Sequence, residues 1–243
     1  MNNEKVTIIG ANSQILEPLI INAKKINIDI QKITRKDWDL TEPKVPLETL
    51  EIIKEFNPEH LIFSAGINKP FYIKNESNYM LESVKEHMSI NCFSFISIVT
   101  ELQNISQNKI ISIHALSSLY GIYGRRTRLP YSVSKHAMEG ALKCLALEYP
   151  KTSIIGYRPG FFKTKLTNDN LSLEMQNKLI DRIPQNRLGL PEEFSKIILN
   201  NIINPPTYLT GNCITIDGGI TAGGFFELWA NHLILLLIHL KSF

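Results

Sequence analysis

Three side chains suited to proton transfer stand at a regular spacing near the middle of the chain. Tyr131 and Lys135 are four residues apart, and Ser118 lies thirteen residues before the tyrosine. On a helix, residues four apart share one face, so the lysine ammonium would lie beside the phenol. A nearby cation favours the phenolate and lowers the pKa of the tyrosine, while a serine hydroxyl could hold a substrate oxygen. Together these groups could move a proton on and off a carbonyl or alcohol, although an ordinary solvated helix face can carry the same spacing.

The composition is that of one globular α/β domain. The chain has 243 residues, of which 44% are hydrophobic and 20% charged, and its net charge of +3 is too small to favour nucleic acid as a partner. No metal-ligand spacing is present, so no metal is expected. Cys92, Cys144 and Cys213 each lie in an apolar segment, where we expect buried reduced thiols. The first residues lead into an expected strand without a signal peptide, which predicts a cytoplasmic protein.

Apolar segments alternate between strand-like and helix-like patterns along the chain. Strands that alternate with helices predict an α/β fold with a parallel sheet covered on both faces. Ligands bind at the carboxyl ends of the strands in such sheets, where Gly10, 64–66, Ser118 and 159–160 would lie. The expected strands are 6–9, 28–33, 61–63, 109–116, 153–157 and 212–216, and the expected helices are 15–25, 47–56, 77–104 (interrupted near its start), 131–149, 171–182 and 191–202.

The order of several segments resembles the short-chain dehydrogenase/reductase family, and it looks closest to the classical branch that includes the 3-oxoacyl-carrier-protein reductases. The resemblance implies a Rossmann-type, doubly wound parallel sheet in a three-layer α/β/α single domain over residues 1–223. Residues 224–243 would then form an apolar C-terminal tail. The matching segments are Ser64, Ala65 and Gly66, Asn91, 117–121, Tyr131 with Lys135, 159–164, 187–193 and 210–219.

The resemblance implies an NAD(P)-dependent oxidoreductase that transfers a hydride between a nicotinamide cofactor and a small carbonyl or alcohol. Tyr131 would be the acid/base that protonates the carbonyl oxygen in reduction or takes the hydroxyl proton in oxidation. Lys135 would lower the pKa of the tyrosine and hold the nicotinamide ribose, and Ser118 would hydrogen-bond the substrate oxygen. Asn91 would steady a water that links Lys135 to solvent. The cofactor supplies the hydride, and the protein supplies orientation and electrostatics.

The loop after the first strand departs from the family pattern. The family has a glycine-rich turn there, whereas this chain keeps Gly10 and has Gln14 and Leu16 at the other two glycine positions. Such glycines permit the tight turn and the close approach of the backbone to the pyrophosphate. Leu16 is expected to displace the helix or to demand a smaller neighbour, and Gln14 adds bulk where it could donate a hydrogen bond. Two alternatives stay open: weakened or rearranged cofactor binding, or a variant loop that still binds well.

The end of the second strand bears on which cofactor is used. NADP(H) is favoured over NAD(H), because Arg35 suits the 2′-phosphate and Asp37 lies slightly late for an acidic residue that binds the ribose hydroxyls; simple solvation of Arg35 is the alternative. Asp39 follows the second strand so soon that little room is left for a helix between them. Together with Leu40, it resembles the pair of residues that flanks the adenine in the family. The expected cofactor-binding residues are Gly10, Asn12, Ser13, Gln14, Ile15, Arg35, Asp39, Leu40, Ser64, Ala65, Gly66, Tyr131, Lys135, Pro159, Gly160, Phe162 and Thr164.

Segment 125–128 and the tail bear on substrate and partners. The segment holds three arginines between Ser118 and Tyr131, and Arg125 could bind a phosphate or carboxylate of an anionic substrate; a solvated loop or a subunit contact are the alternatives.

The tail 224–243 is too short to span a bilayer. It is expected to pack on a partner subunit, with a membrane-surface contact as the less favoured alternative. The resemblance implies a homo-oligomer, either a dimer or a tetramer, formed through the two long helices expected at 83–104 and 131–149.

Two other functions remain as alternatives to a carbonyl reductase or alcohol dehydrogenase. The short connection after the second strand resembles that of sugar-nucleotide reductases, which favours an enzyme that modifies a free or nucleotide-linked sugar. The altered glycine loop favours a catalytically silent binding subunit of the same fold. The four residues Asn91, Ser118, Tyr131 and Lys135 argue against that second alternative.

Overall fold

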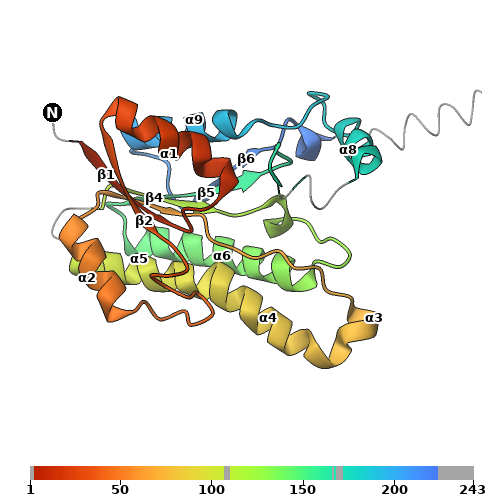
Figure 1. Cartoon of the computed structure of the whole chain (residues 1–243), viewed down its shortest axis with the longest axis horizontal. Coiled ribbons are helices and arrows are strands. Elements are labelled where there is room, and N and C mark those ends of the chain that lie inside the picture. Colours follow the sequence, from red (N-terminus) through yellow and green to blue (C-terminus); the bar gives the residue numbers. More distant parts are fainter. Residues whose placement is uncertain (1–2, 107–109, 166, 168–171, 224–243) are drawn as a thin grey trace, which may run out of the picture.

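A six-stranded parallel sheet lies between two layers of helices (Figure 1). The computed structural model describes residues 3–106, 110–165, 167 and 172–223. The strand order β2-β1-β3-β4-β5-β6 reverses direction beside β1, as in doubly wound sheets. All six expected strands are confirmed, although β4 starts three residues later than expected. The strands are β1 (Glu4–Ile9), β2 (Ile28–Ile33), β3 (His60–Phe63), β4 (Ser112–Leu116), β5 (Ser153–Pro159) and β6 (Asn212–Ile216).

Helices cover both faces of this sheet, which gives the predicted three-layer α/β/α architecture (Figure 1). One face carries α1 (Glu17–Ala23) and α9 (Pro191–Ile203), which pack on each other. The opposite face carries α2 (Leu47–Phe56), α4 (Met80–Met88), α5 (Ser94–Ile105) and α6 (Leu129–Glu148). Two short helices, α3 (Ile73–Glu76) and α8 (Leu173–Ile180), lie beyond the carboxyl ends of the strands.

Alternate strand residues build two separate cores. On β3, Leu61 and Phe63 face the α5–α6 layer, whereas Ile62 faces the α1–α9 layer. Phe63 packs against Phe95 of α5 with ring centroids 5.5 Å apart. Fully burying one such side chain stabilises a fold by roughly 1.5–3 kcal/mol. The two cores therefore fix both helix layers on the sheet and set the positions of the strand ends.

A chain of polar side chains runs through the α1–α9 side of the sheet. His60 Nδ1 lies 2.7 Å from Ser112 Oγ, which lies 2.7 Å from His114 Nε2. His114 Nδ1 lies 2.9 Å from the hydroxyl of Tyr157, to which Asn201 of α9 donates at 2.9 Å. Burial, followed by the charge of His60, lowers the pKa of His114 to about 3. Both ring nitrogens of His114 thus have partners that suit a neutral imidazole.

The long helical segment expected at 77–104 is interrupted at two places. A 3₁₀ turn at Ser77–Tyr79 precedes α4, which confirms an interruption near the start. A π-helical turn, Ser89–Phe93, also separates α4 from α5, and the sequence pattern did not predict it. Such turns are rare and frequently occur at functional sites. Asn91 lies in this turn and is fully buried.

The connection from β2 to α2 contains neither helix nor strand, so the expectation of a short connection is confirmed. Trp38 is buried within it, and its Nε1 donates to the carbonyl of Glu42 at 3.0 Å. Thr49 Oγ1 donates to the carbonyl of Asp37 at 2.6 Å, which joins the connection to α2. Since no strand lies beyond it, β2 forms one edge of the described sheet.

Two other expectations are resolved in part. Cys92 is buried as expected, but Cys144 is exposed and Cys213 only partly buried, so the prediction of three buried thiols was wrong for these two. Cys144 lies on the outer face of α6, because an apolar stretch of sequence still turns one face of a helix to solvent. The tail at 224–243 lies outside the described residues. None of the helices described has the length and apolar character to cross a membrane.

Candidate active site

Ser118, Tyr131 and Lys135 meet where β4 ends against α6. Ser118 follows β4 and starts a 3₁₀ turn, with its Oγ accepting the backbone N–H of Tyr120 at 3.2 Å. The side chain of Ser118 lies near the Tyr131 hydroxyl and lowers the pKa of that phenol. Lys135, one helical turn after Tyr131, places its Nζ 5.8 Å from the centroid of the phenol ring. The structure therefore brings together the three side chains that the sequence spacing singled out.

The electrostatics of this group differ from the expectation. Burial raises the pKa of Tyr131 to about 12, although the side chain of Ser118 opposes the shift. Lys135 Nζ points at the carbonyl of Leu116, 2.7 Å away, and burial lowers the pKa of this lysine to about 8. The prediction that Lys135 lowers the pKa of Tyr131 is thus not met in this structure. The cause is that desolvation outweighs the cation, which faces a backbone carbonyl instead of the phenolic oxygen.

Asn91 holds the loop after β3 against this group. Its Oδ1 accepts from the N–H of Ile67 at 2.8 Å, and its Nδ2 donates to the carbonyl of the same residue at 3.0 Å. Nδ2 also lies 2.9 Å from Ser134 Oγ, on the turn of α6 between Tyr131 and Lys135. The amide side chain therefore joins the π turn, the loop and α6. The expected water between Asn91 and Lys135 remains a prediction.

The segment Ser64, Ala65 and Gly66 lies close to both Gly10 and the lysine. A Cβ on Gly10 would lie 2.6 Å from the Ala65 backbone, and Gly10 has φ of +79°, so no other residue fits there without strain. Ser64 Oγ donates to the Gly10 carbonyl at 2.9 Å. A Cβ on Gly66 would lie 3.6 Å from Lys135 Nζ. Gly10, 64–66 and Lys135 thus lie next to one another at the carboxyl edge of the sheet, and we call this set of residues the floor of the site.

Leu16 is accommodated by a change in the local helix type. A 3₁₀ turn at Gln14–Leu16 precedes α1, which starts only at Glu17. Leu16 is fully buried in the α1–α9 core, so it does not enter the cofactor side of the loop. Ile15 packs against the same core, and its carbonyl accepts from Ser195 Oγ at 3.0 Å. The α-helix therefore starts two residues later than expected, at Glu17, after this 3₁₀ turn.

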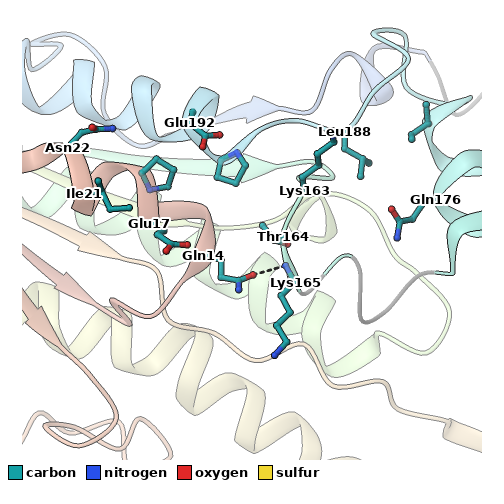
Figure 2. Close-up of a pocket in the computed structure, with 13 residues that line it drawn as sticks. Gln14, Glu17, Ile21, Asn22, Lys163, Thr164, Lys165, Gln176, Leu188 and Glu192 are labelled. Carbon is teal, nitrogen blue, oxygen red and sulfur yellow. Dashed lines mark hydrogen bonds between the residues drawn. The ribbon is translucent and has the colours of Figure 1, made fainter.

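Gln14 bridges two loops at the carboxyl ends of β1 and β5. Its Oε1 accepts from the backbone N–H of Lys165 at 2.6 Å, as Figure 2 shows. Thr164, Lys165 and Gln14 line one end of a cavity of about 590 Å³ that continues between α1, α8 and the start of α9. In the expected donor role, Gln14 would offer N–H groups to phosphate. Its carbonyl oxygen is occupied as an acceptor, and the donor role of Nε2 remains a prediction.

Some residues of segment 159–164 lie in the hydrophobic core, and others lie at the expected cofactor site. The Gly160 N–H donates to the carbonyl of Ile216 at 2.8 Å, and a Cβ on Gly160 would lie 2.7 Å from Asp217. Phe162 is buried against Phe194, with ring centroids 5.6 Å apart. Only the backbone of Phe162 can therefore contribute to the expected cofactor site, because its side chain belongs to the core. A phenylalanine at position 162 already indicated a buried side chain, but the match of segment 159–164 to the family led us to expect it in the cofactor site.

The remaining expected cofactor residues lie along the same sheet edge. Arg35 Nη2 lies 3.4 Å from Asp39 Oδ2 in an exposed ion pair. The carbonyl of Leu40 accepts from Ser89 Oγ at 2.8 Å, which joins this segment to the π turn. Ser13 donates its N–H to Gly10 at 3.1 Å and closes the loop on which the exposed Asn12 lies.

The partners of the fully buried Lys135 ammonium indicate whether a dinucleotide fits the carboxyl edge of the sheet. Among the described residues, its oxygen partner is the Leu116 carbonyl, and its other close contact is Met138 Sδ at 3.8 Å. An ammonium has three donors, so hydroxyl acceptors such as those of a ribose would suit it. Gly66, which has no side chain, is exposed beside it. These residues fit a nicotinamide dinucleotide.

An ion pair next to Ser118 was missed by the sequence reasoning. Glu139 of α6 accepts from Ser117 Oγ at 2.6 Å and forms a two-point pair with Arg158 of β5. Both charged side chains are largely buried. A glutamate on the apolar face of a helix, one turn after Lys135, was the available signal.

Segment 125–128 is not a uniformly solvated basic loop. Arg125 is exposed, donates to the Tyr120 hydroxyl at 2.5 Å and lies over that ring, which is 6.0 Å from Tyr131 in an edge arrangement. Arg126 is exposed. Arg128 is half-buried at the N-terminus of α6, where burial lowers its pKa. The sequence reasoning selected Arg125, but Arg128 is the arginine whose charge lowers the pKa of Tyr131.

Comparisons with known proteins identify the family. Residues 51–221 match the family model described as "Enoyl-(Acyl carrier protein) reductase". The chain is 32% identical to the 3-oxoacyl-[acyl-carrier-protein] reductase FabG of Buchnera aphidicola subsp. Baizongia pistaciae, over 90% of this chain and 88% of that protein. It is 31% identical to carbonyl reductase family member 4 of Xenopus laevis, over 68% and 67% of the two chains.

Solved structures agree in fold. The structure of 4-hydroxyisoleucine dehydrogenase complexed with NADH has a TM-score of 0.78 at 22% identity, covering 91% of this chain and 100% of that chain. A short-chain dehydrogenase family protein from Francisella tularensis has a TM-score of 0.77 at 23% identity, covering 90% and 99%.

With the parallel sheet, the site at its carboxyl edge and these matches, the chain belongs to the short-chain dehydrogenase/reductase family. It is an NAD(P)-dependent enzyme, and oxidoreduction of a small molecule is its general chemistry.

Proposed function

We propose that the enzyme reduces a carbonyl compound with NADPH, and that Tyr131 donates the proton to the carbonyl oxygen. The nearness of the Tyr131 and Ser118 side chains carries this proposal, since one substrate oxygen can contact both hydroxyls. A tyrosine with a pKa of about 12 carries its proton at neutral pH, so the proton that a carbonyl oxygen takes up in reduction is present on the phenol.

Each residue of the group has a separate task in this proposal. Ser118 hydrogen-bonds the carbonyl oxygen and aligns it with the phenol. Lys135 holds ribose hydroxyls of the cofactor. Its positive charge stabilises the phenolate that forms when Tyr131 gives up its proton. Asn91 keeps Ile67 and Gly66 in place, so that the floor beside Lys135 stays open. The cofactor, when bound, supplies the hydride.

The cofactor preference rests on the end of β2. Arg35 is 82% exposed and can turn toward a 2′-phosphate, at the cost of a surface ion pair that contributes little. Asp37 Oδ2 accepts from the N–H and hydroxyl of Thr34, at 2.7 and 2.9 Å, and so turns away from ribose hydroxyls. Both observations support NADP(H) over NAD(H).

The first experiment is titration calorimetry with NADPH and NADH separately. We expect tighter binding of NADPH, and Arg35→Ala should weaken NADPH binding about tenfold while changing NADH binding little. Lys54→Ala, which removes an exposed charge on α2, is the control. Equal losses for both cofactors would contradict the role of Arg35. Failure of the wild type to bind either would favour the nonenzymatic alternative.

The second experiment tests Tyr131 directly. Tyr131→Phe should abolish turnover, by at least a thousandfold in kcat, and leave cofactor affinity nearly unchanged. The variant keeps the ring contacts and removes only the hydroxyl. Retained turnover would overturn the assignment of Tyr131.

A homo-oligomer built on α5 and α6 is also proposed. Val133, Cys144 and Leu147 are exposed on α6, and Phe93 is exposed at the start of α5. Apolar residues at helical spacing on an outer face favour helix packing between subunits. Light scattering should give a dimer or tetramer for the wild type, and Leu147→Asp should shift it to a smaller species. A monomeric wild type would contradict the proposal.

The sugar-modifying alternative has weaker support. The short connection after β2 is present, but it lies at the cofactor end of the sheet and does not form the surroundings of Tyr131. A phosphorylated sugar is included in the substrate tests below, so this alternative is examined together with the substrate class.

A further inference from the structure

We infer that Arg128 binds an anionic group of the substrate, a carboxylate or a phosphate, while Tyr131 and Ser118 hold its carbonyl oxygen. The inference rests on the proposed function and names a substrate class for it: carbonyl compounds that carry an oxyanion near the reacting carbon. Four observations lead to it.

The first observation is the set of contacts that Arg128 makes. Its side chain is half-buried, and its Nε is fully shielded from solvent without a hydrogen-bond partner. Nη1 donates to the carbonyl of the preceding residue, Thr127, at 3.3 Å. A polar group that is shielded from solvent and has no partner destabilises the protein, and more strongly when it is charged. An anion that accepts from Nε, once the guanidinium turns toward it, relieves this destabilisation.

The second observation is the lack of a carboxylate partner. None of the six ion pairs among the described residues includes Arg125, Arg126 or Arg128. The charged neighbour that most affects Arg128 is another cation, Arg125, and its remaining charged influences are the tyrosines 72, 120 and 131. The local charge is therefore positive, and an anion is the group that would balance it.

The third observation is the position of Arg128 relative to the acid/base residue. It is the cap of α6, three residues before Tyr131, and its charge favours the phenolate of that tyrosine. The positive end of the α6 dipole lies in the same place. An anion bound at Arg128 would therefore lie at the same end of α6 as Tyr131.

The fourth observation is the backbone that aims the side chain. Thr127 has φ of +63°, a left-handed conformation that is an outlier for a β-branched residue. Its carbonyl accepts from the N–H of the buried Phe71 at 2.9 Å, and Arg128 donates its N–H to Arg125 at 3.1 Å. Strain of this kind persists where surrounding contacts enforce it, and it clusters at ligand clamps. Here it turns Arg128 inward, whereas Arg125 and Arg126 remain exposed.

The fork of an arginine suits both a carboxylate and a phosphate, because each offers two oxygens to parallel N–H donors. The test therefore uses matched pairs that differ only in the anion: 3-oxobutanoate with its methyl ester, and dihydroxyacetone phosphate with dihydroxyacetone. The ratio of kcat/KM within each pair is measured for the wild type, for Arg128→Gln and for Arg126→Gln. Arg126→Gln removes the same charge from an exposed position of the same segment.

We expect the wild type to prefer the anionic member of one pair by at least tenfold. Arg128→Gln should reduce this ratio at least tenfold, and Arg126→Gln should keep it within about twofold. The pair that shows the preference distinguishes carboxylate from phosphate. A wild-type ratio near one in both pairs, or an unchanged ratio in Arg128→Gln, would overturn the inference.

Two further measurements keep the result decisive. If Arg128→Gln does not fold, as judged by its melting curve, Arg128→Lys replaces it; a lysine keeps the charge but lacks the fork, so an unchanged ratio would contradict the inference. Calorimetric titration with 3-oxobutanoate and inorganic phosphate needs no turnover. Binding that is lost only in the Arg128 variant, in an enzyme that reduces none of the four compounds, would support the anion site while the proposed function fails. Absence of anion binding and of turnover together would overturn both.

Discussion

Arg158 and Glu139 face each other through two parallel hydrogen bonds, Nε to Oε1 at 2.8 Å and Nη2 to Oε2 at 2.6 Å. The pair joins β5 to α6, and Glu139 Oε1 also accepts from Ser117, the residue before Ser118. A Cβ on Gly121 would lie 2.3 Å from the same oxygen, so the glycine leaves room for the carboxylate. The pair thus fixes the backbone on which Ser118 lies.

Removing one partner of this pair should destabilise the protein strongly. Arg158→Met leaves Glu139 buried with its charge uncompensated, and we expect a loss of about 3–5 kcal/mol in the free energy of unfolding. Arg187→Met is the matched control, because Arg187 forms a similar pair with Glu193 at the surface and should cost less than about 1 kcal/mol. Urea unfolding measures both. Equal losses would show that burial does not distinguish the two pairs.

Lys135 should lower the stability of the protein at neutral pH. Its pKa of about 8 lies below the ordinary value of 10.5, so the unfolded chain binds more protons between these values and stability rises with pH across that window. Below pH 8 Lys135 is charged in both states, so the full cost of burying its charge lowers the stability of the folded protein. Lys135→Met should therefore raise the free energy of unfolding by about 2 kcal/mol at pH 7, after allowance for the lost hydrogen bond to Leu116.

Urea unfolding without cofactor at pH 7 and near pH 10 measures this effect, and the gain should shrink at the higher pH. Lys143→Met, an exposed lysine of the same helix, should change stability by less than about 0.5 kcal/mol. A Lys135→Met variant that is less stable than the wild type at pH 7 would contradict the prediction.

His114 should make the fold sensitive to acid. Its pKa in the folded protein is about 3, below the ordinary 6.5, so only the unfolded chain takes up the proton between these values. The stability is fully present above pH 6.5 and falls on acidification by about 1.4 kcal/mol per pH unit. His114→Gln should reduce the loss between pH 7 and pH 5 by roughly 2 kcal/mol. His136→Gln, on the exposed face of α6, is the control, and an identical pH slope in both variants would argue against His114.

Gln14 should compete with the cofactor phosphates. Its side chain occupies the N–H of Lys165 across the two loops where a pyrophosphate is proposed to lie. Gln14→Gly frees that donor and should tighten cofactor binding about threefold. Gln14→Glu keeps the acceptor but adds a negative charge, which should weaken binding about tenfold. Calorimetry with NADPH compares the two, and weaker binding by the glycine variant would mean that the glutamine assists the cofactor.

The local patterns predicted most of the fold. Strands such as 28–33 and 212–216 and the helix at 47–56 were predicted with the bounds that the structure has, because short apolar runs between turn residues leave few alternatives. The spacing of Tyr131 and Lys135 placed both on one helix, as observed. These predictions depend on residues close in sequence.

The errors concern contacts between distant segments. The partner of Lys135 is the carbonyl of Leu116, and no side-chain pattern reveals which backbone oxygen a lysine will reach. The pair of Glu139 and Arg158 spans a helix and a strand, so each residue looked like an isolated charge in an apolar segment. Cys144 illustrates the opposite error, since average hydrophobicity conceals which face of a helix a residue occupies.

Because of the π turn at Ser89–Phe93, the site depends on the number of residues between α4 and α5 as well as on their types. A π turn holds one residue more than the α turn it replaces, and each residue of a helix advances the direction of side chains by about 100°. Deleting one residue there would restore an unbroken α-helix, in which α4 and α5 keep their faces but the side chains inside the turn change direction. Asn91 would then leave Ile67, although every side chain of the site was still encoded. Evolution can exchange residues in this segment, but an insertion or deletion that a surface loop would tolerate would here take apart the floor of the site.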